Sequence, residues 1–147
     1  YRSKNATDLL STYVKSRSEG FGKEVKRRIM LGTYVLSAGY YDAYYTKAQK
    51  IRRLIKERTN EILSEYDFII SPTTPHSAFD IGSQSEDPIK MYLEDIFTVQ
   101  ANLAGLPAIS LPLGKSKENM PFGIQLIGSA FEEGKLLNFS EYLINMN

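Results

Sequence analysis

The sequence predicts an α/β fold in which a helical first part is followed by short strands mixed with helices. Helical hydrophobic periodicity extends through the first 65 residues, and the period then changes to short apolar runs bounded by proline and glycine. Two of these runs, residues 108–113 and 122–127, flank a polar turn. Helices followed by strands mixed with further helices are typical of the α/β and α+β classes.

Three helices are expected before the first strand. The first begins with Asn5 as its N-cap and ends before the glycines at positions 20 and 22. The second fits residues 23–37 and has apolar side chains on several sides, so we expect it to be largely buried. The third follows Gly39 and runs to about Glu65, with an apolar seam opposite lysines and arginines, as in an amphipathic surface helix.

The second part is expected to contribute further strands and helices. The strands are predicted at residues 68–70, 108–113 and 122–127, and the helices at residues 91–104 and 131–144. Gly105, with a proline two positions later, stops the first of these helices. A long loop over residues 71–90 precedes that helix, and loops of this length are usually functional or disordered.

The predicted strands make a poor free-standing sheet. The runs at residues 68–70 and 108–113 are continuously apolar, as expected of strands that are covered on both faces. We therefore expect the strands to complete a larger, mixed sheet that is covered by helices and is incomplete in this chain. The first residue is Tyr1 and no signal-peptide pattern follows it, so we interpret the 147 residues as a fragment.

The composition excludes several classes of protein and of site. The chain is 42% hydrophobic and 24% charged over 147 residues, which is enough for a folded core and argues against a disordered protein. No apolar stretch approaches the ~18 residues of a membrane span. The absence of cysteine and the single histidine, His76, exclude thiolate zinc sites, cysteine nucleophiles and histidine-rich metal sites.

Charge is distributed unevenly along the chain. Residues 1–60 contain 14 Lys and Arg against 5 Asp and Glu, whereas residues 61–147 contain 4 against 12. One hypothesis is a basic helical module that binds RNA or an acidic protein. In that module, bases would stack on Tyr40, Tyr41, Tyr44 and Tyr45. The simpler interpretation places the basic residues on solvated helix faces and the tyrosines in the apolar seam of the third helix.

The common catalytic motifs give little support for chemistry in this chain. A Ser-His-Asp set would need His76, which lies in a proline-flanked loop, and there is no G-x-S-x-G elbow or Gly-rich phosphate loop. Lys26, Arg27 and Arg28 point about 100° apart on the second helix, so at least one of them is expected to meet a partner. For an arginine that partner is a carboxylate, which belongs either to a structural salt bridge or to a ligand.

Two sequence blocks resemble a known family. The C-terminal block of the amidase signature family is similar to the run from Asn102 to Gly128, NLAGLPAISLPLG…MPFGIQLIG. A narrower group, the A subunits of glutamyl-tRNA(Gln) and aspartyl-tRNA(Asn) amidotransferases, resembles the run from Ser18 to Ile55, and PTTPHSAFDIG and DPIKMYLEDI fit the same group. The resemblance implies that residues 1–147 are the C-terminal portion of one amidase-signature domain. This portion is helical over residues 1–66 and completes the sheet over residues 67–147.

The resemblance implies a binding role rather than a catalytic one. Members of the family hydrolyse amides with a Ser–cis-Ser–Lys triad in a Gly- and Ser-rich signature, and nothing in this chain matches that signature. No catalytic residue is therefore expected here, and the chain by itself should be inactive. Arg28 is expected to bind the α-carboxylate of glutamine and Asp95 its α-ammonium, with Arg27 as the nearest misassignment. In the alternative hypothesis, another amidase-signature hydrolase acts on uncharged amides and needs neither charge.

Partners follow from the same resemblance. In the family, ammonia released from glutamine passes to a B subunit, where ATP-activated Glu-tRNA(Gln) is converted to Gln-tRNA(Gln) in a heterotrimer with B and C subunits. ATP and magnesium are therefore expected on the partner subunit, misacylated tRNA only through it, and no cofactor on this chain. We expect a location in the bacterial cytoplasm, or in an organelle of a eukaryote, and no membrane partner.

Overall fold

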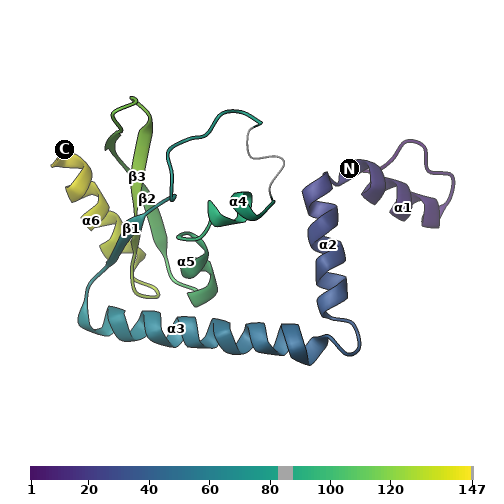
Figure 1. Cartoon of the computed structure of the whole chain (residues 1–147), viewed down its shortest axis with the longest axis horizontal. Helices are drawn as coiled ribbons and strands as arrows, with labels where there is room; N and C mark the ends of the chain where they lie inside the picture. Colours follow the sequence, from purple (N-terminus) through teal and green to yellow (C-terminus); the bar gives the residue numbers. More distant parts are fainter. Residues whose placement is uncertain (83–87, 147) are drawn as a thin grey trace. The chain divides into compact units, whose positions relative to one another are not determined.

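The computed structural model describes residues 1–82 and 88–146. The chain divides into two compact units, Tyr1–Gln49 and Lys50–Asn147, which are called the first and second units below. The boundary lies near the start of a long helix, whereas the change from helices to strands follows that helix (Figure 1). Packing and secondary structure therefore divide the chain at different points.

The first helix of the first unit, α1 (Leu9–Gly20), begins after Asp8, so the predicted N-cap at Asn5 is wrong. The Asp8 carboxylate accepts a hydrogen bond from the Ser11 amide at 2.7 Å, and the Ser11 hydroxyl accepts one from the Asp8 amide at 2.9 Å. This reciprocal capping box satisfies two amides at once, whereas the amide of Asn5 is bonded to the hydroxyl of Ser3. Local hydrogen bonding therefore selects the later start.

Helix α2 (Lys23–Val35) begins where the sequence predicts, but none of its residues is buried. Val25, Ile29 and Leu31 are each about half exposed. The expectation of a largely buried helix is wrong for this unit, because its few short elements supply too little surface to cover apolar side chains on several sides.

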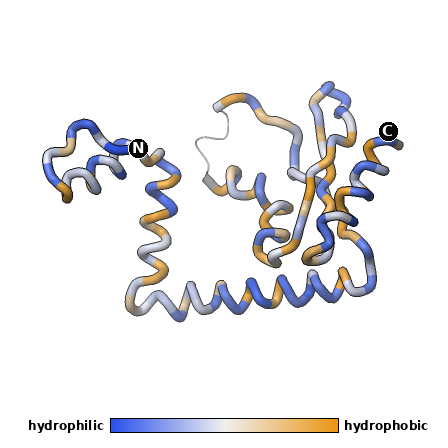
Figure 2. Tube along the Cα trace, turned by 180° about the vertical axis from the view of Figure 1, so that it is seen from behind, coloured by the Kyte–Doolittle hydropathy of each residue, from blue (hydrophilic) through white to orange (hydrophobic). Residues whose placement is uncertain are grey.

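A π-helical turn, η1 (Tyr41–Thr46), leads directly into helix α3 (Lys47–Glu65). The predicted long third helix is therefore confirmed, with a π-helical start that the hydrophobic pattern does not reveal. Hydrophilic residues dominate much of α3 in Figure 2, and two of the charged ones, Arg53 and Glu57, are exposed and pair at 2.8 Å. Thr59, on the opposite side, is fully buried. The predicted amphipathic character is thus confirmed.

The second unit contains an antiparallel sheet in which β3 (Pro121–Ile127) lies between β1 (Ile69–Pro72) and β2 (Ala108–Lys115) (Figure 1). The predicted strands are confirmed, with β1 beginning one residue later than expected. Strands β2 and β3 stay in one register from Ala108 opposite Ile127 to a bulge between Pro112 and Gly114. The strand pairs described here are all antiparallel, and the larger mixed sheet stays a prediction.

The core of the second unit lies between this sheet and helix α6 (Glu133–Asn145). Its buried members are Leu111 of β2, Leu126 of β3 and Leu136 of α6. The predicted final helix is confirmed, but Phe131 is outside it, because this residue has a φ of 64° and is exposed. Alternation along the strands places Leu111 and Leu126 on the same face of the sheet, which is the face that α6 covers.

The single helix predicted over residues 91–104 is wrong. Two short helices, α4 (Pro88–Leu93) and α5 (Val99–Ala104), are separated by a turn. After α4 the amides of Asp95 and Ile96 bond to carbonyls three residues earlier, and the carbonyl of Phe97 accepts a hydrogen bond from a side chain of β3. Competition from these bonds interrupts the helix, although Gly105, with a φ of 71°, ends α5 as predicted.

The second face of the sheet carries a polar row. Gln125 of β3 lies opposite Ser71 of β1 and Ser110 of β2, so all three side chains lie on the face away from α6. The turn between α4 and α5 approaches this face, where the carbonyl of Phe97 meets Gln125. Both faces of the sheet are thus contacted at β3, one by α6 and the other by this turn.

The chain exposes more surface than its size requires. Its accessible surface is 11396 Å², against about 9,100 Å² for two compact domains of these lengths. No helix among the described residues is long and apolar enough to cross a membrane. The excess surface consists in part of large apolar side chains on α1, α2 and α4.

Candidate functional site

Arg28 lies on α2, and its side chain is 62% exposed. Its Nε donates to Oε1 of Glu24 at 3.1 Å, and the neighbouring Arg27 donates from Nη1 to Oε2 of the same carboxylate at 3.2 Å. Lys26 points elsewhere and bonds to the carbonyl of Ser18. The expectation that this basic run meets a carboxylate is confirmed, with Glu24 shared between two arginines.

This geometry orients the two guanidinium groups without burying them. Both pairs join residues three or four positions apart on one exposed helix face, where an ion pair contributes little to stability. A guanidinium held in this way is accessible to an anionic ligand, and its planar fork suits a carboxylate.

Asp95 lies in the turn between α4 and α5, and it is exposed. The backbone carbonyl of Asp95 accepts hydrogen bonds from the amides of Thr98 and Val99, both at 3.0 Å, and from the hydroxyl of Thr98. These bonds fix the backbone that carries the carboxylate. Arg28 belongs to the first unit and Asp95 to the second, and their proximity stays a prediction.

The neighbouring acid, Glu94, has a different environment. Its side chain is 15% exposed, and its Oε1 lies 3.3 Å from Nδ1 of His76, which is itself largely exposed. The adjacent acids Glu94 and Asp95 therefore do not form a pair of solvated carboxylates, because Glu94 faces the loop and Asp95 faces solvent.

Gln125 is a buried polar residue beside the turn that carries Asp95, and hydrophobic periodicity does not single it out. It is 5% exposed in the central strand, and its Nε2 donates to the carbonyl of Phe97 at 2.9 Å and to the hydroxyl of Ser71 at 3.3 Å. A polar residue within the apolar run GIQLIG was the available signal, since buried amides require partners.

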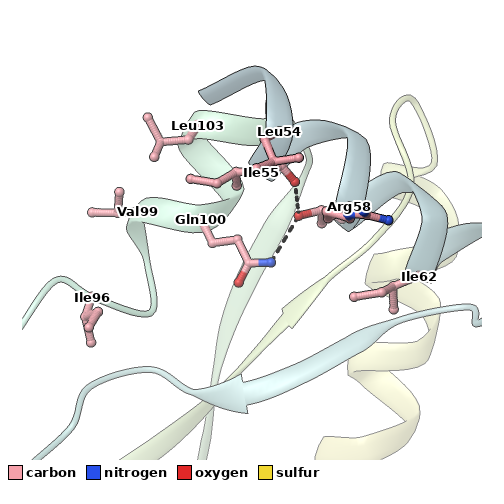
Figure 3. Close-up of a pocket in the computed structure, with 9 residues that line it drawn as sticks. Leu54, Ile55, Arg58, Ile62, Ile96, Val99, Gln100 and Leu103 are labelled. Atoms are coloured by element: carbon pink, nitrogen blue, oxygen red, sulfur yellow. Dashed lines mark hydrogen bonds between the residues drawn. The ribbon is translucent and has the colours of Figure 1, made fainter. Parts of the chain in front are cut away.

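An apolar groove of about 440 Å³ lies between α3 and α5 (Figure 3). Leu54 and Ile62 line it from α3, and Val99 and Leu103 line it from α5. Its charged lining residue, Arg58, is exposed and pairs with Glu61 on the same helix. The groove suits packing against apolar groups and offers little for catalysis.

Two hydrogen bonds join α5 to α3 beside this groove. The side-chain Nε2 of Gln100 donates to the buried hydroxyl of Thr59 at 3.1 Å, and that hydroxyl donates to the carbonyl of Ile55 (Figure 3). Nε of Arg52 donates to the carbonyl of Leu103 at 3.1 Å. Helix α5 is therefore anchored to α3 at both of its ends.

The tyrosines of the basic part contact one another. Tyr34 and Tyr40 have ring centroids 4.4 Å apart, and Tyr41 and Tyr45 have centroids 4.9 Å apart. Most of these rings are about half exposed, so the interpretation as a buried seam is wrong. Mutual packing occupies much of the ring surface that a base would need. Over the residues that the structure describes, no cluster of three His, Cys, Asp or Glu side chains could hold a metal ion.

Comparisons with known proteins agree on one family. A family model described as Amidase matches residues 2–137. The A subunit of glutamyl-tRNA(Gln) amidotransferase from Chlorobium limicola is 56% identical over 97% of this chain and 30% of its own length. Its counterpart from Brevibacillus brevis is 60% identical over 92% of this chain and 28% of its own length. The chain thus spans about 30% of the length of these curated relatives.

Solved structures give the same result. The A subunit of glutamyl-tRNA(Gln) amidotransferase from Thermotoga maritima is 55% identical with a TM-score of 0.63, covering 86% of this chain and 27% of that one. The structure of 6-aminohexanoate cyclic dimer hydrolase is 28% identical with a TM-score of 0.58, covering 65% of this chain and 22% of that one. The predicted fold class, part of an amidase-signature α/β fold, is confirmed.

Proposed function

This chain belongs to the amidase family, and on that premise we propose that it is the glutamine-recognising part of a glutaminase subunit in a tRNA-dependent amidotransferase. Such an enzyme releases ammonia from glutamine and uses it to convert Glu-tRNA(Gln) to Gln-tRNA(Gln). The observation that carries the proposal is the identity of 56% and 60% to amidotransferase A subunits over more than nine-tenths of the chain. The cyclic dimer hydrolase is half as similar, which disfavours the alternative of an amidase for uncharged amides.

Recognition of free glutamine requires two charges of opposite sign. In the proposed site Arg28 binds the α-carboxylate through its guanidinium, and Asp95 binds the α-ammonium. Two observations support these roles. Both side chains are exposed in their own units. The ion pair with Glu24 limits the movement of the Arg28 side chain, and hydrogen bonds to the Asp95 carbonyl fix the backbone that carries the Asp95 carboxylate. A hydrophobic or uncharged amide would gain nothing from either residue.

The amide-cleaving step belongs to residues outside this sequence. The family's Ser–cis-Ser–Lys triad has no counterpart among these 147 residues, so glutamine held by Arg28 and Asp95 would be attacked by a serine supplied by another segment. Ammonia would then pass to a B subunit that binds ATP and magnesium, with a C subunit completing the heterotrimer. Misacylated tRNA would contact that assembly through the B subunit, in the cytoplasm of a bacterium or in an organelle.

The experiment uses the complete subunit in its complex. Replacing Arg28 or Asp95 with alanine should raise the KM for glutamine about 10- to 100-fold, because each change removes a charged hydrogen bond of ~1.5–3 kcal/mol. Amidation supported by free ammonia should be retained, since ammonia bypasses the glutamine site. Arg27→Ala is the matched control, because Arg27 shares Glu24 with Arg28 and has no proposed ligand.

Two results would contradict the proposal. Equal loss of glutamine- and ammonia-dependent activity in the Arg28 and Asp95 variants would show a folding defect instead of a binding role. Turnover of glutamine by the 147-residue chain alone, in a glutaminase assay, would show that the amide-cleaving groups lie within it.

A further inference from the structure

A buried amide lies at the centre of the sheet. Gln125 is 5% exposed, and its neighbours along β3, Leu126 and Ile127, are also buried. Burying an amide without hydrogen-bond partners is unfavourable, so its presence in an apolar strand depends on the bonds that it makes. The partners of this side chain therefore indicate what it does.

Those partners tie the sheet to the turn that carries Asp95. Nε2 of Gln125 donates to the carbonyl of Phe97 at 2.9 Å and to the hydroxyl of Ser71 at 3.3 Å. Beside it in the polar row, the hydroxyls of Ser110 and Thr73 lie 2.8 Å apart. Gln125 is thus fixed in the strand that is hydrogen-bonded on both edges, and the carbonyl that it holds is two residues from Asp95.

Backbone hydrogen bonds within this turn shape it without attaching it to the sheet. The amides of Thr98 and Val99 bond to the carbonyl of Asp95, so these bonds begin and end inside the turn and the start of α5. Helix α5, which follows, is attached to α3 through Gln100. The bond from Gln125 to Phe97 is therefore a direct connection between the turn and the sheet.

We infer that Gln125 is a positioning residue, whose amide holds the turn of residues 94–98 against the sheet and so directs the Asp95 carboxylate toward the α-ammonium of glutamine. This inference rests on the proposed function, and it adds a specificity role for a residue that does not touch the ligand. Loss of the bond leaves the Phe97 carbonyl without this donor and releases the turn. The position of Asp95 then becomes less defined, which weakens recognition of the ammonium but not the chemistry on ammonia.

The test compares two substrates in the complete subunit within its complex. Glutamine and 4-carbamoylbutanoate share the carboxylate and the side-chain amide, but only glutamine has the α-ammonium. The ratio of their kcat/KM values therefore measures recognition of that charge. Asp95→Asn should lower this ratio by about tenfold or more, the expected loss for a charged hydrogen bond.

Gln125→Met keeps the size and burial of the side chain but cannot donate. It should lower the ratio about tenfold by raising the KM for glutamine, which is less than the ~100-fold that a 1 Å misplacement can cost. Ammonia-dependent amidation should stay within about twofold of the parent. Ser140→Ala is the matched control. It removes a buried hydroxyl that donates to the carbonyl of Leu136 at 2.7 Å, and both residues belong to α6, far along the chain from the turn. This control should leave the ratio unchanged.

The outcomes separate the two claims. If Asp95→Asn leaves the ratio unchanged, the role proposed for Asp95 fails. If Asp95→Asn lowers the ratio and Gln125→Met does not, the positioning role alone is overturned. If Gln125→Met also abolishes ammonia-dependent activity, Gln125→Asn decides, because it keeps an amide in the polar row but is one methylene too short to hold the bond to the Phe97 carbonyl. A reduced ratio in Gln125→Asn supports the inference, and an unchanged ratio overturns it.

Discussion

Truncation of Leu126 tests whether the sheet and α6 form the stable centre of the second unit. Leu126 is 0% exposed in β3, and it packs with Leu111 of β2 and Leu136 of α6. Leu126→Ala removes three carbons, which at ~0.8 kcal/mol per buried methylene corresponds to about 2.4 kcal/mol. Strand β3 is hydrogen-bonded to a strand on each side and cannot shift to fill the space, so the cavity raises the expected loss to about 3–4 kcal/mol.

Leu113→Ala is the matched control, because it makes the same chemical change in β2 at a residue that is 40% exposed. Its expected cost is below ~1.5 kcal/mol, since much of the side chain already contacts water. Hydrogen exchange of the complete subunit, read by mass spectrometry on peptides from β2, β3 and α6, measures the local opening free energy. A loss of about 3 kcal/mol accelerates exchange by more than about 100-fold, at tenfold per 1.4 kcal/mol. Equal acceleration by both variants would refute the reasoning, because burial would then not decide the cost.

Two further predictions concern the strand pairing and the first helix. Gly123→Ala would place a Cβ 2.7 Å from the carbonyl oxygen of Leu111, so we expect the free energy of unfolding to fall by about 1–3 kcal/mol and the thermal midpoint to drop. Gly134→Ala is the control and should not lower the midpoint, because its added Cβ meets no atom within 4 Å. Hydrogen bonds from Ser11 hold the pKa of the Asp8 carboxyl below its ordinary value of 3.8. The ionised Asp8 cap therefore stabilises α1 fully above pH 3.8, and this stabilisation is lost as the pH falls through the lower pKa of the folded state. NMR chemical shifts of α1 should show this acid-induced fraying in the parent but not in Asp8→Asn, and identical acid profiles would contradict the assignment.

Much of the secondary structure is predictable from local pattern. The strands β2 and β3, the stop at Gly105 and the long helix α3 follow from apolar runs, turn residues and helical periodicity. The errors occur where hydrogen bonds compete. The capping box at Asp8 displaces the start of α1, and the bond from Gln125 to Phe97 helps to divide the helix predicted over residues 91–104.

The candidate site shows a similar division. The family resemblance predicts Arg28 and Asp95 as site residues, because a residue that matches a motif can be named without coordinates. No motif predicts that Gln125 attaches the Asp95 turn to the sheet. The sequence shows only one amide in an apolar strand, because the group that accepts its hydrogen bond, the Phe97 carbonyl, belongs to the backbone. Backbone partners are the same at every residue and leave no trace in the sequence.

Sequence alone determined the family and the order of most helices and strands, and it predicted the charged residues proposed to bind a zwitterionic amino acid, because these depend on residue type and spacing along the chain. Tertiary structure alone decided which face of the sheet α6 covers, which apolar helices stay exposed, and which buried amide holds the turn of residues 94–98. The physical reason is that burial and hydrogen-bond pairing arise between segments distant in sequence, and hydrophobic periodicity indicates that a face is to be covered without indicating by what.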